Sequence, residues 1–354
     1  MPFNRNMLNL ARELRAVTQA DLSSKSSVSQ TKISKFEAGL LVPTDEDVCK
    51  LADALELPIE FFSHRGPRPA RASTCLHHRK NAGAKVRDLD RVHAHFAYMR
   101  MQIDELLAGV KIGASQSVYQ IDVDAMDGDV EQIAAIVRQT WGVPPGPIDN
   151  LTLLIEHAGA IVVAAPFYSD AISAMSFWPD SGSPIIFVNA SMPGDRLRFS
   201  LAHELGHLVM HATPTGEVEA EANRFAAELL MPKATIFPEL SSGVLSLQKL
   251  AALKVRWKVA IQALARRAHD LEIVSERQYR SLLVRISKMG WRTNEPIRVE
   301  PEQSTVLPSI LTHYLDRKGY TRAELSKLML SVEPQLDRNF LVGKDQSNRL
   351  RLAE

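Results

Sequence analysis

The segment His203-Glu204-Leu205-Gly206-His207 constrains the fold and chemistry of this chain more than any other. Two histidines four positions apart project from one face of a helix, so both rings can reach one metal ion. Glu204 lies beside that face, where it can reach a metal-bound water without being a ligand. The surrounding sequence predicts a helix over 193–212, with a separate buried stripe of Leu197, Leu201, Leu205 and Leu208.

Zn²⁺ bound by two histidines requires a third protein ligand and an open position for water. Glu219 is the best candidate, because it starts a second predicted helix, 217–230, that a turn over 212–216 would bring alongside the first. Glu217 and Glu221 compete with it, and the residues alone leave the choice open. Asn223, one turn further, could hydrogen-bond a ligand histidine from behind. His211 lies on the same helix face as His203 and His207, but three residues spaced by four cannot all reach one ion. We therefore expect His211 to contact a metal ligand without binding the metal, or to face solvent.

Such a site predicts hydrolysis of a peptide bond. Zinc lowers the pKa of bound water from about 15.7 to near 7, and Glu204 would act as the general base that takes its proton. Three strands are predicted, over 161–165, 171–178 and 184–189, and the second could align a peptide substrate by adding it to its edge. Tyr168 is a candidate oxyanion donor, although a structural tyrosine is the simpler interpretation.

Two longer motifs surround these residues and resemble the ImmA/IrrE family of metallopeptidases. The motifs are Arg198-Phe-Ser-Leu-Ala-His-Glu-Leu-Gly-His207 and Glu219-Ala-Glu-Ala-Asn-Arg-Phe-Ala-Ala-Glu-Leu-Leu-Met-Pro232. The resemblance extends over residues 74–295, with Ala260–Ala268 and Gln278–Arg280 similar to the family's helical C-terminal part. It implies a gluzincin-like domain whose third ligand precedes the asparagine by four residues, which is Glu219. Characterised members cleave helix-turn-helix repressors in mobile-element or stress responses.

The N-terminal residues 5–62 resemble the lambda-repressor-like XRE helix-turn-helix family. The resemblance rests on Leu14-Arg-Ala-Val-Thr-Gln-Ala-Asp-Leu22, on Val28-Ser-Gln-Thr-Lys-Ile-Ser-Lys-Phe-Glu-Ala-Gly39 and on Pro43. The pattern predicts short helices with Thr18 and Ser29 as N-caps and Gly39 as a stop signal. Ser27 stands in the inter-helix turn where the family usually has glycine, which tolerates a left-handed backbone at less cost.

In this fold the start of the second helix of the motif enters the major groove of DNA. We expect Gln30 and Lys35 to read bases, beside Thr31 and Ser34, because Gln can pair with adenine and Lys with guanine. Gln19 and Lys32 are expected to hold phosphates. Acidic and basic residues nearly balance over residues 1–64, so no strong basic field supports DNA binding. A bundle that docks proteins instead is the alternative.

Composition bounds the remaining possibilities. A chain of 354 residues suggests two or three domains, and it contains no run of 18 apolar residues that would predict a membrane span. Cys49 and Cys75 are the only cysteines, so no disulfide framework is expected and we predict a cytoplasmic protein. Residues 65–100 carry nine Lys or Arg against two Asp, which fits a solvated linker face or a phosphate track.

These observations predict an α+β protein in five segments. They are a DNA-binding domain (1–64), a basic linker with a long connecting helix (65–110), a zinc metallopeptidase domain (111–240), its helical extension (241–295) and a partly disordered C-terminal segment (296–354). The expected function is transcriptional control coupled to cleavage of a regulatory protein, with operator DNA and a repressor as partners of a homodimer. The alternative is a non-enzymatic DNA-binding regulator, or an antitoxin-like protein, in which zinc serves structure or sensing.

Overall fold

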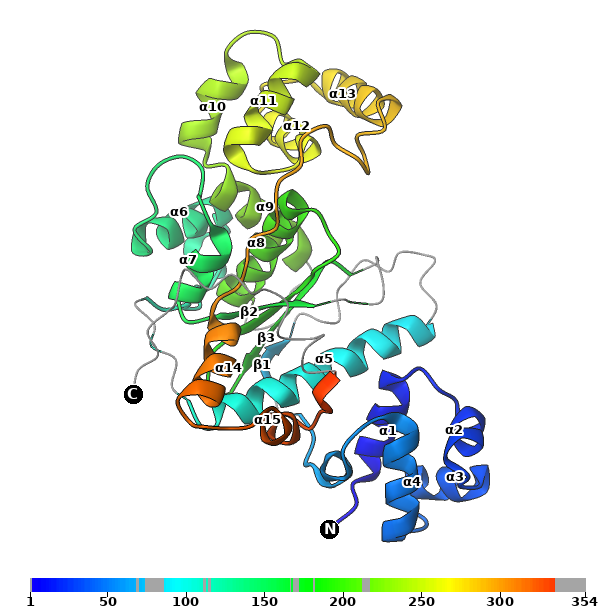
Figure 1. Ribbon diagram of the computed structural model, residues 1–354. Coiled ribbons are helices and arrows are strands. Elements are labelled where there is room, and N and C mark those ends of the chain that lie inside the picture. The colour runs from blue at the N-terminus through cyan, green and yellow to red at the C-terminus, as the bar shows by residue number, and fades with distance from the viewer. Residues whose placement is uncertain are drawn as a thin grey trace.

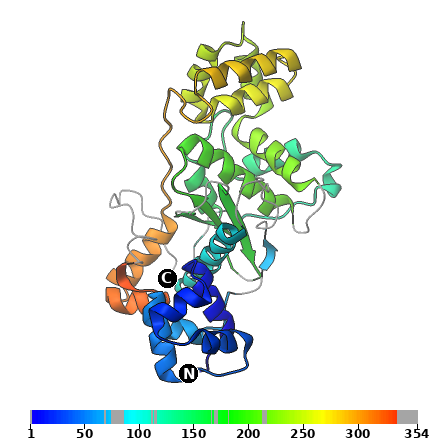
Figure 2. The same ribbon diagram turned by 90° about the vertical axis from the view of Figure 1, so that its right-hand side faces the viewer.

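The computed structural model describes residues 2–67, 70–73, 86–110, 113, 116–165, 167, 172–180, 182–211 and 217–334. Figures 1 and 2 show a helical head at the N-terminus, a small sheet with helices on both sides, and a helical extension at the end opposite the head. The expected α+β class is confirmed. No helix among these residues combines the length and apolar character needed to cross a membrane.

The head is a bundle of short helices whose ends follow the capping signals of the sequence. Thr18 is the expected N-cap of the second helix and forms a reciprocal capping box with Asp21, and Ser29 and Gly39 bound the third helix as expected. Ser27 adopts the left-handed backbone of the inter-helix turn, with φ of 59°. The helices are α1 (Arg5–Leu14), α2 (Gln19–Ser26), α3 (Gln30–Ala38), α4 (Asp45–Leu55) and the 3-10 helix η1 (Ile59–Ser63).

Four strands form one sheet in the order β1-β3-β4-β2. The strands are β1 (Ala70–Ser73), β2 (Ile161–Ala165), β3 (Ala174–Pro179) and β4 (Ile185–Asn189); β2 is parallel to β4, and the other neighbours are antiparallel. The last three were expected from the sequence, but β1 was not, because residues 65–71 were interpreted as a linker. Backbone pairing with β3 holds this four-residue strand, and such pairing leaves no pattern in the side chains.

The helix α5 (Val86–Leu107) is the long helix that the sequence predicts, and it is buried on two sides. Phe96, Met99 and Ile103 pack under the sheet, whereas Ala94 and Tyr98 belong to the core of the head. Figure 1 shows α5 between the head and the sheet. The head is therefore docked on α5 by a shared apolar core.

The opposite face of the sheet carries the helices that build the candidate site. These helices are η2 (Asp124–Met126), α6 (Val130–Thr140), α7 (Leu151–His157), α8 (Gly194–Met210) and α9 (Val218–Leu230). Strand residues alternate between the two faces: Ala174 and Ile186 join the core beneath α8, whereas Met175 and Ile185 join the core above α5. This alternation also places Ser176 on the α8 side.

The chain then forms the extension and returns to the sheet. The elements are α10 (Lys233–Ser241), α11 (Leu247–Trp257), α12 (Ile261–Asp270), α13 (Glu276–Lys288), α14 (Val306–Asp316) and α15 (Arg322–Leu328). Figure 1 shows the segment between α13 and α14 running back past α8. Buried ion pairs hold it: Lys254 contacts Asp195 of α8 and Glu295, and Arg198 of α8 contacts Glu302. Neither α14 nor α15 was expected from the sequence.

Candidate metal centre

The candidate site lies where α8 and α9 pack against each other. Gly206 makes their close approach possible, because a Cβ atom there would lie only 3.0 Å from Cδ1 of Phe225 on α9. The apolar side of α8, including Leu205, is buried against the sheet, as the leucine stripe predicts. The opposite side directs His203 and His207 toward the first turn of α9, where Glu219 lies.

The ligand atoms of these three side chains form a compact triangle. The two Nε2 atoms of His203 and His207 are 3.0 Å apart. Oε2 of Glu219 lies 3.5 Å from Nε2 of His203, and its Oε1 lies 3.4 Å from Nε2 of His207. A tetrahedral Zn²⁺ with bonds of about 2.0–2.1 Å spaces its ligands about 3.3 Å apart. The three side chains therefore converge closely enough to share one such ion.

The hydrogen bonds around His203 show that this donor set suits a cation. Asn223 donates from Nδ2 to the backbone oxygen of Glu219 at 2.7 Å, which fixes the orientation of its amide. Its Oδ1 then faces Nδ1 of His203 at 3.2 Å and must accept the proton there. A neutral His203 consequently presents the lone pair of Nε2 to the other two ligands, which are also electron-pair donors. A metal ion between them would satisfy all three.

The electrostatics of the triangle agree with this interpretation. Without a metal, protonated His203 and His207 would donate hydrogen bonds to Glu219 and hold its pKa far below its usual range, so its carboxylate is ionised. Burial alone would lower the pKa of His203, but the hydrogen bond with Glu219 and the charges of Glu204 and Glu219 raise it overall. The site thus attracts positive charge, which a proton or a metal ion can supply.

Glu204 is not part of the triangle, and a residue of the sheet holds its side chain in place. Its side chain is 2% exposed, and Oε2 accepts a hydrogen bond of 2.7 Å from the hydroxyl of Ser176 on β3. Sequence reasoning missed Ser176, although the alternation of β3 would have placed it on the same face as Ala174. The carboxylate expected to act as general base is therefore preoriented by a strand.

The structure places the three competing carboxylates differently. Glu219 lies against the histidine pair, whereas Oε2 of Glu221 is 2.9 Å from Nε2 of His211. Glu217 is exposed at the N-cap position of α9. His211 is buried, which excludes the solvent-facing alternative for that residue.

Two expectations concern the path of a substrate: the edge of β3 and the side chain of Tyr168. Residues 177–179 of β3 pair with β1, so this part of the strand edge is not open to a substrate. The reason is the unexpected strand from the linker, which takes part of that edge. Tyr168 lies outside the described residues.

The head presents the expected recognition helix to solvent. Gln30, Thr31, Ser34 and Lys35 are exposed on α3, while Ile33 and Phe36 are buried beneath them. The two residues expected at phosphates have partners within the head. Gln19 donates to Glu37 at 2.7 Å, and Nζ of Lys32 lies 3.2 Å from Asp47.

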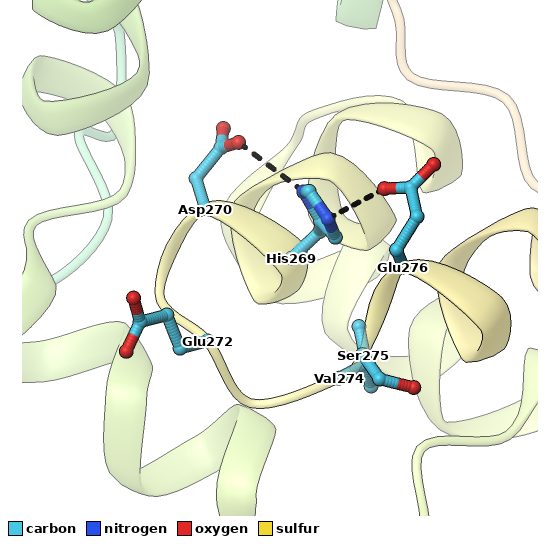
Figure 3. A pocket seen from close by; sticks show the side chains of 6 residues that line it. All are labelled: His269, Asp270, Glu272, Val274, Ser275 and Glu276. Carbon is cyan, nitrogen blue, oxygen red and sulfur yellow. Dashed lines mark ion pairs between the residues drawn. The ribbon is translucent and has the colours of Figure 1, made fainter.

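A second group of acidic residues with a histidine lines a hollow in the extension, between α12 and α13 (Figure 3). Nε2 of His269 lies 2.9 Å from Glu276, and its Nδ1 lies 3.7 Å from Asp270. Both ring nitrogens therefore face carboxylates, one on the adjacent residue and one at the start of α13, while Glu272 lies apart from them in Figure 3. This arrangement places one half-buried histidine between two carboxylates, in contrast to the convergent triangle between α8 and α9.

Comparison with known families gives two matches, one at the N-terminus and one in the central part of the chain. Residues 155–269 match the IrrE N-terminal-like domain, which spans β2 to α12 and includes the triangle. Residues 7–60 match a helix-turn-helix domain. No curated protein matches the chain. Both resemblances drawn from the sequence are confirmed, and the chain combines a helix-turn-helix domain with a peptidase-like domain.

Proposed function

We propose that this chain, which joins a helix-turn-helix domain to an IrrE N-terminal-like domain, is a transcriptional regulator with a zinc-dependent endopeptidase that cleaves a regulatory protein. The observation that carries the proposal is the triangle of His203, His207 and Glu219 with the separately held Glu204 beside it. A structural zinc site requires four protein ligands and no carboxylate poised next to them. Three ligands and a nearby carboxylate fit a hydrolytic site.

The residues divide the work of hydrolysis. When bound, Zn²⁺ supplies Lewis acidity and makes hydroxide available near neutral pH. His203, His207 and Glu219 would hold the ion, and Asn223 would keep His203 oriented. The Glu204 carboxylate would accept the proton of the attacking water and return it to the leaving amine, while Ser176 keeps that carboxylate in place.

The head would bring this activity to specific DNA. Gln30 and Lys35, with Thr31 and Ser34, would contact bases in the major groove. Lys32 and Gln19 would have to exchange their partners Asp47 and Glu37 for phosphates. Modules of this kind usually read two half-sites, so we propose that the chain acts as a homodimer on its operator.

The substrate that we propose is another helix-turn-helix repressor, cleaved in a stress or mobile-element response. The test is to induce wild-type protein and the Glu204→Gln variant in the same cells and to compare which proteins lose their intact form. We expect a small set, including a DNA-binding repressor, to be lost only with wild type. Identical protein patterns in the two strains would overturn the proposal.

A second candidate function is a DNA-binding regulator that uses the metal for sensing, including an antitoxin-like protein. The docking of the head on α5 favours it, because α5 also packs under the sheet that carries Ser176. A change in the metal centre on metal binding could thereby alter the position of the helix-turn-helix domain without any cleavage. In that case Glu204→Gln should regulate like wild type, whereas His203→Ala should fail.

A further inference from the structure

A chain of three side chains extends from the candidate metal centre into the protein. His211 lies one turn after His207 on α8, and the Nδ1 atoms of the two rings are 2.8 Å apart. Nε2 of His211 in turn lies 2.9 Å from Oε2 of Glu221 on α9. The side chains of His207 and His211 are each 3% exposed, and that of Glu221 is 17% exposed. These contacts are therefore shielded from solvent.

The chemistry of the atoms fixes where the protons lie. An ionised Glu221 only accepts hydrogen bonds, so Nε2 of His211 must carry a proton. In a neutral His211, Nδ1 is then an acceptor, and the proton between the two rings belongs to Nδ1 of His207. His207 is left with a lone pair on Nε2, the atom that faces His203 and Glu219. With these proton positions, both contacts of His211, to His207 and to Glu221, are hydrogen bonds.

The two histidines of the triangle are thus supported unequally. His203 contacts the neutral amide of Asn223, which is exposed. His207 is instead connected through the buried ring of His211 to the carboxylate of Glu221. A partner that accepts from the far nitrogen of a histidine ligand orients the ring and raises the basicity of the metal-facing nitrogen. The negative charge of Glu221 would add to this effect across the His211 ring.

We propose that His211 and Glu221 are positioning residues that hold His207 in the tautomer and ring orientation required to bind the metal. The proposal rests on the proposed function, because it assumes that the triangle binds zinc. In this proposal α9 contributes to the site twice. Glu219 is a metal ligand, and Glu221, two residues later, holds His207 in place through His211. Because Glu219 and Glu221 lie on the same helix, the positions of both carboxylates depend on the packing of α9 against α8.

The test measures the zinc affinity of the full chain by competition with a chromophoric chelator, alongside the thermal unfolding of the metal-free protein. His211→Phe keeps a ring but removes both hydrogen bonds. His211→Asn keeps an acceptor near the position of Nδ1 and loses Glu221. Glu221→Gln removes only the charge, and Glu217→Gln alters an exposed carboxylate on the same turn as a matched control.

We expect His211→Phe to weaken zinc binding about 10- to 100-fold, the usual effect of losing such a partner. His211→Asn and Glu221→Gln should weaken it less, and Glu217→Gln should match wild type. A merely structural role would lower the unfolding temperature of the metal-free protein without changing zinc affinity. Should His211→Phe fail to fold, Glu221→Gln decides the matter by itself.

The outcomes separate this proposal from the proposed function. Unchanged zinc affinity in Glu221→Gln and in folded His211→Phe would overturn the positioning role while leaving the metal centre intact. If wild type itself bound no zinc, the proposed function would fail first, and this proposal would fail with it.

Discussion

The hydroxyl of Ser176 on β3 donates a hydrogen bond of 2.7 Å to Oε2 of Glu204 on α8. Both groups are almost fully buried, so the bond is protected from water. It links the sheet to the helix that carries both histidines of the triangle. The proposed general base therefore shares a helix with the two histidine ligands but is oriented by the sheet.

Replacing Ser176 with alanine should slow cleavage without removing the metal. A hydrogen bond to a charged group contributes about 1.5–3 kcal/mol, and we expect roughly a tenfold loss in kcat because the carboxylate remains near its position. Ser191→Ala, which removes a hydroxyl bonded to Asn189 at 2.8 Å instead, is the matched control. Steady-state kinetics and zinc content check this, and wild-type kcat in Ser176→Ala would show that the bond plays no part in catalysis.

Zinc stoichiometry should identify the third ligand. We expect one zinc per chain in wild type and a loss of tightly bound zinc in Glu219→Ala, because two histidines alone leave the triangle open. Glu221→Ala should still bind one zinc, more weakly, and Glu217→Ala should bind like wild type. Metal analysis after dialysis is sufficient. Retention of zinc by Glu219→Ala together with its loss from Glu221→Ala would show that the wrong carboxylate was chosen.

DNA binding should depend on α3 and not on the metal. Each good base contact contributes about 1–3 kcal/mol of discrimination, so the double variant Gln30→Ala, Lys35→Ala should lose its operator while keeping its fold and zinc. Lys50→Ala is the control, since this lysine is paired with Glu46 on α4. Binding of selected operator sequences would be measured by titration. Unaltered sequence preference in the double variant would rule out this recognition surface, and a footprint of a single half-site would contradict the proposed dimer.

The buried Glu156 should make stability depend on pH. Burial raises its pKa to about 7, although hydrogen bonds from Thr305 and Val306 at the start of α14 partly oppose this. The folded state therefore holds a proton that the unfolded chain, with a carboxyl pKa near 4.5, releases. The contribution of Glu156 is complete below about pH 4.5 and is lost as the pH rises through about 7, by on the order of 3 kcal/mol.

Unfolding midpoints of wild type and Glu156→Gln between pH 5 and pH 8 check this prediction. The amide resembles the protonated carboxyl but does not titrate, so the variant should gain stability relative to wild type as the pH rises. Glu46→Gln, at an exposed carboxylate paired with Lys50, should show no such trend. A constant difference between wild type and Glu156→Gln over this range would contradict a raised pKa.

Sequence patterns predicted the elements that local rules control. Caps at Thr18, Ser29 and Gly39 bound the head helices, and the spacing of His203 and His207 placed both rings on one side of α8. The choice of Glu219 required the family resemblance, because three glutamates alternate along the start of α9. Their different surroundings follow from how α9 packs on α8, which no local pattern encodes.

The features that the sequence analysis missed depend on contacts between distant segments. β1 exists through backbone pairing with β3, about a hundred residues further along the chain. Ser176 meets Glu204 only because β3 lies under α8. The helix α14 did leave a signal, since Val306, Leu307, Ile310 and Leu311 recur at helical spacing and are buried. Its role as a cover of the sheet still required the long return from α13.

The most direct test of the central claim compares the rate at which purified wild type, Glu204→Gln and Glu217→Gln cleave the repressor identified in cells. Glu204→Gln removes the general base but leaves His203, His207 and Glu219 in place. We predict that it binds one zinc per chain and cleaves at least about a hundredfold more slowly, the usual contribution of a positioned acid–base group, while Glu217→Gln matches wild type. Cleavage by Glu204→Gln at the wild-type rate, with zinc bound, would contradict the account.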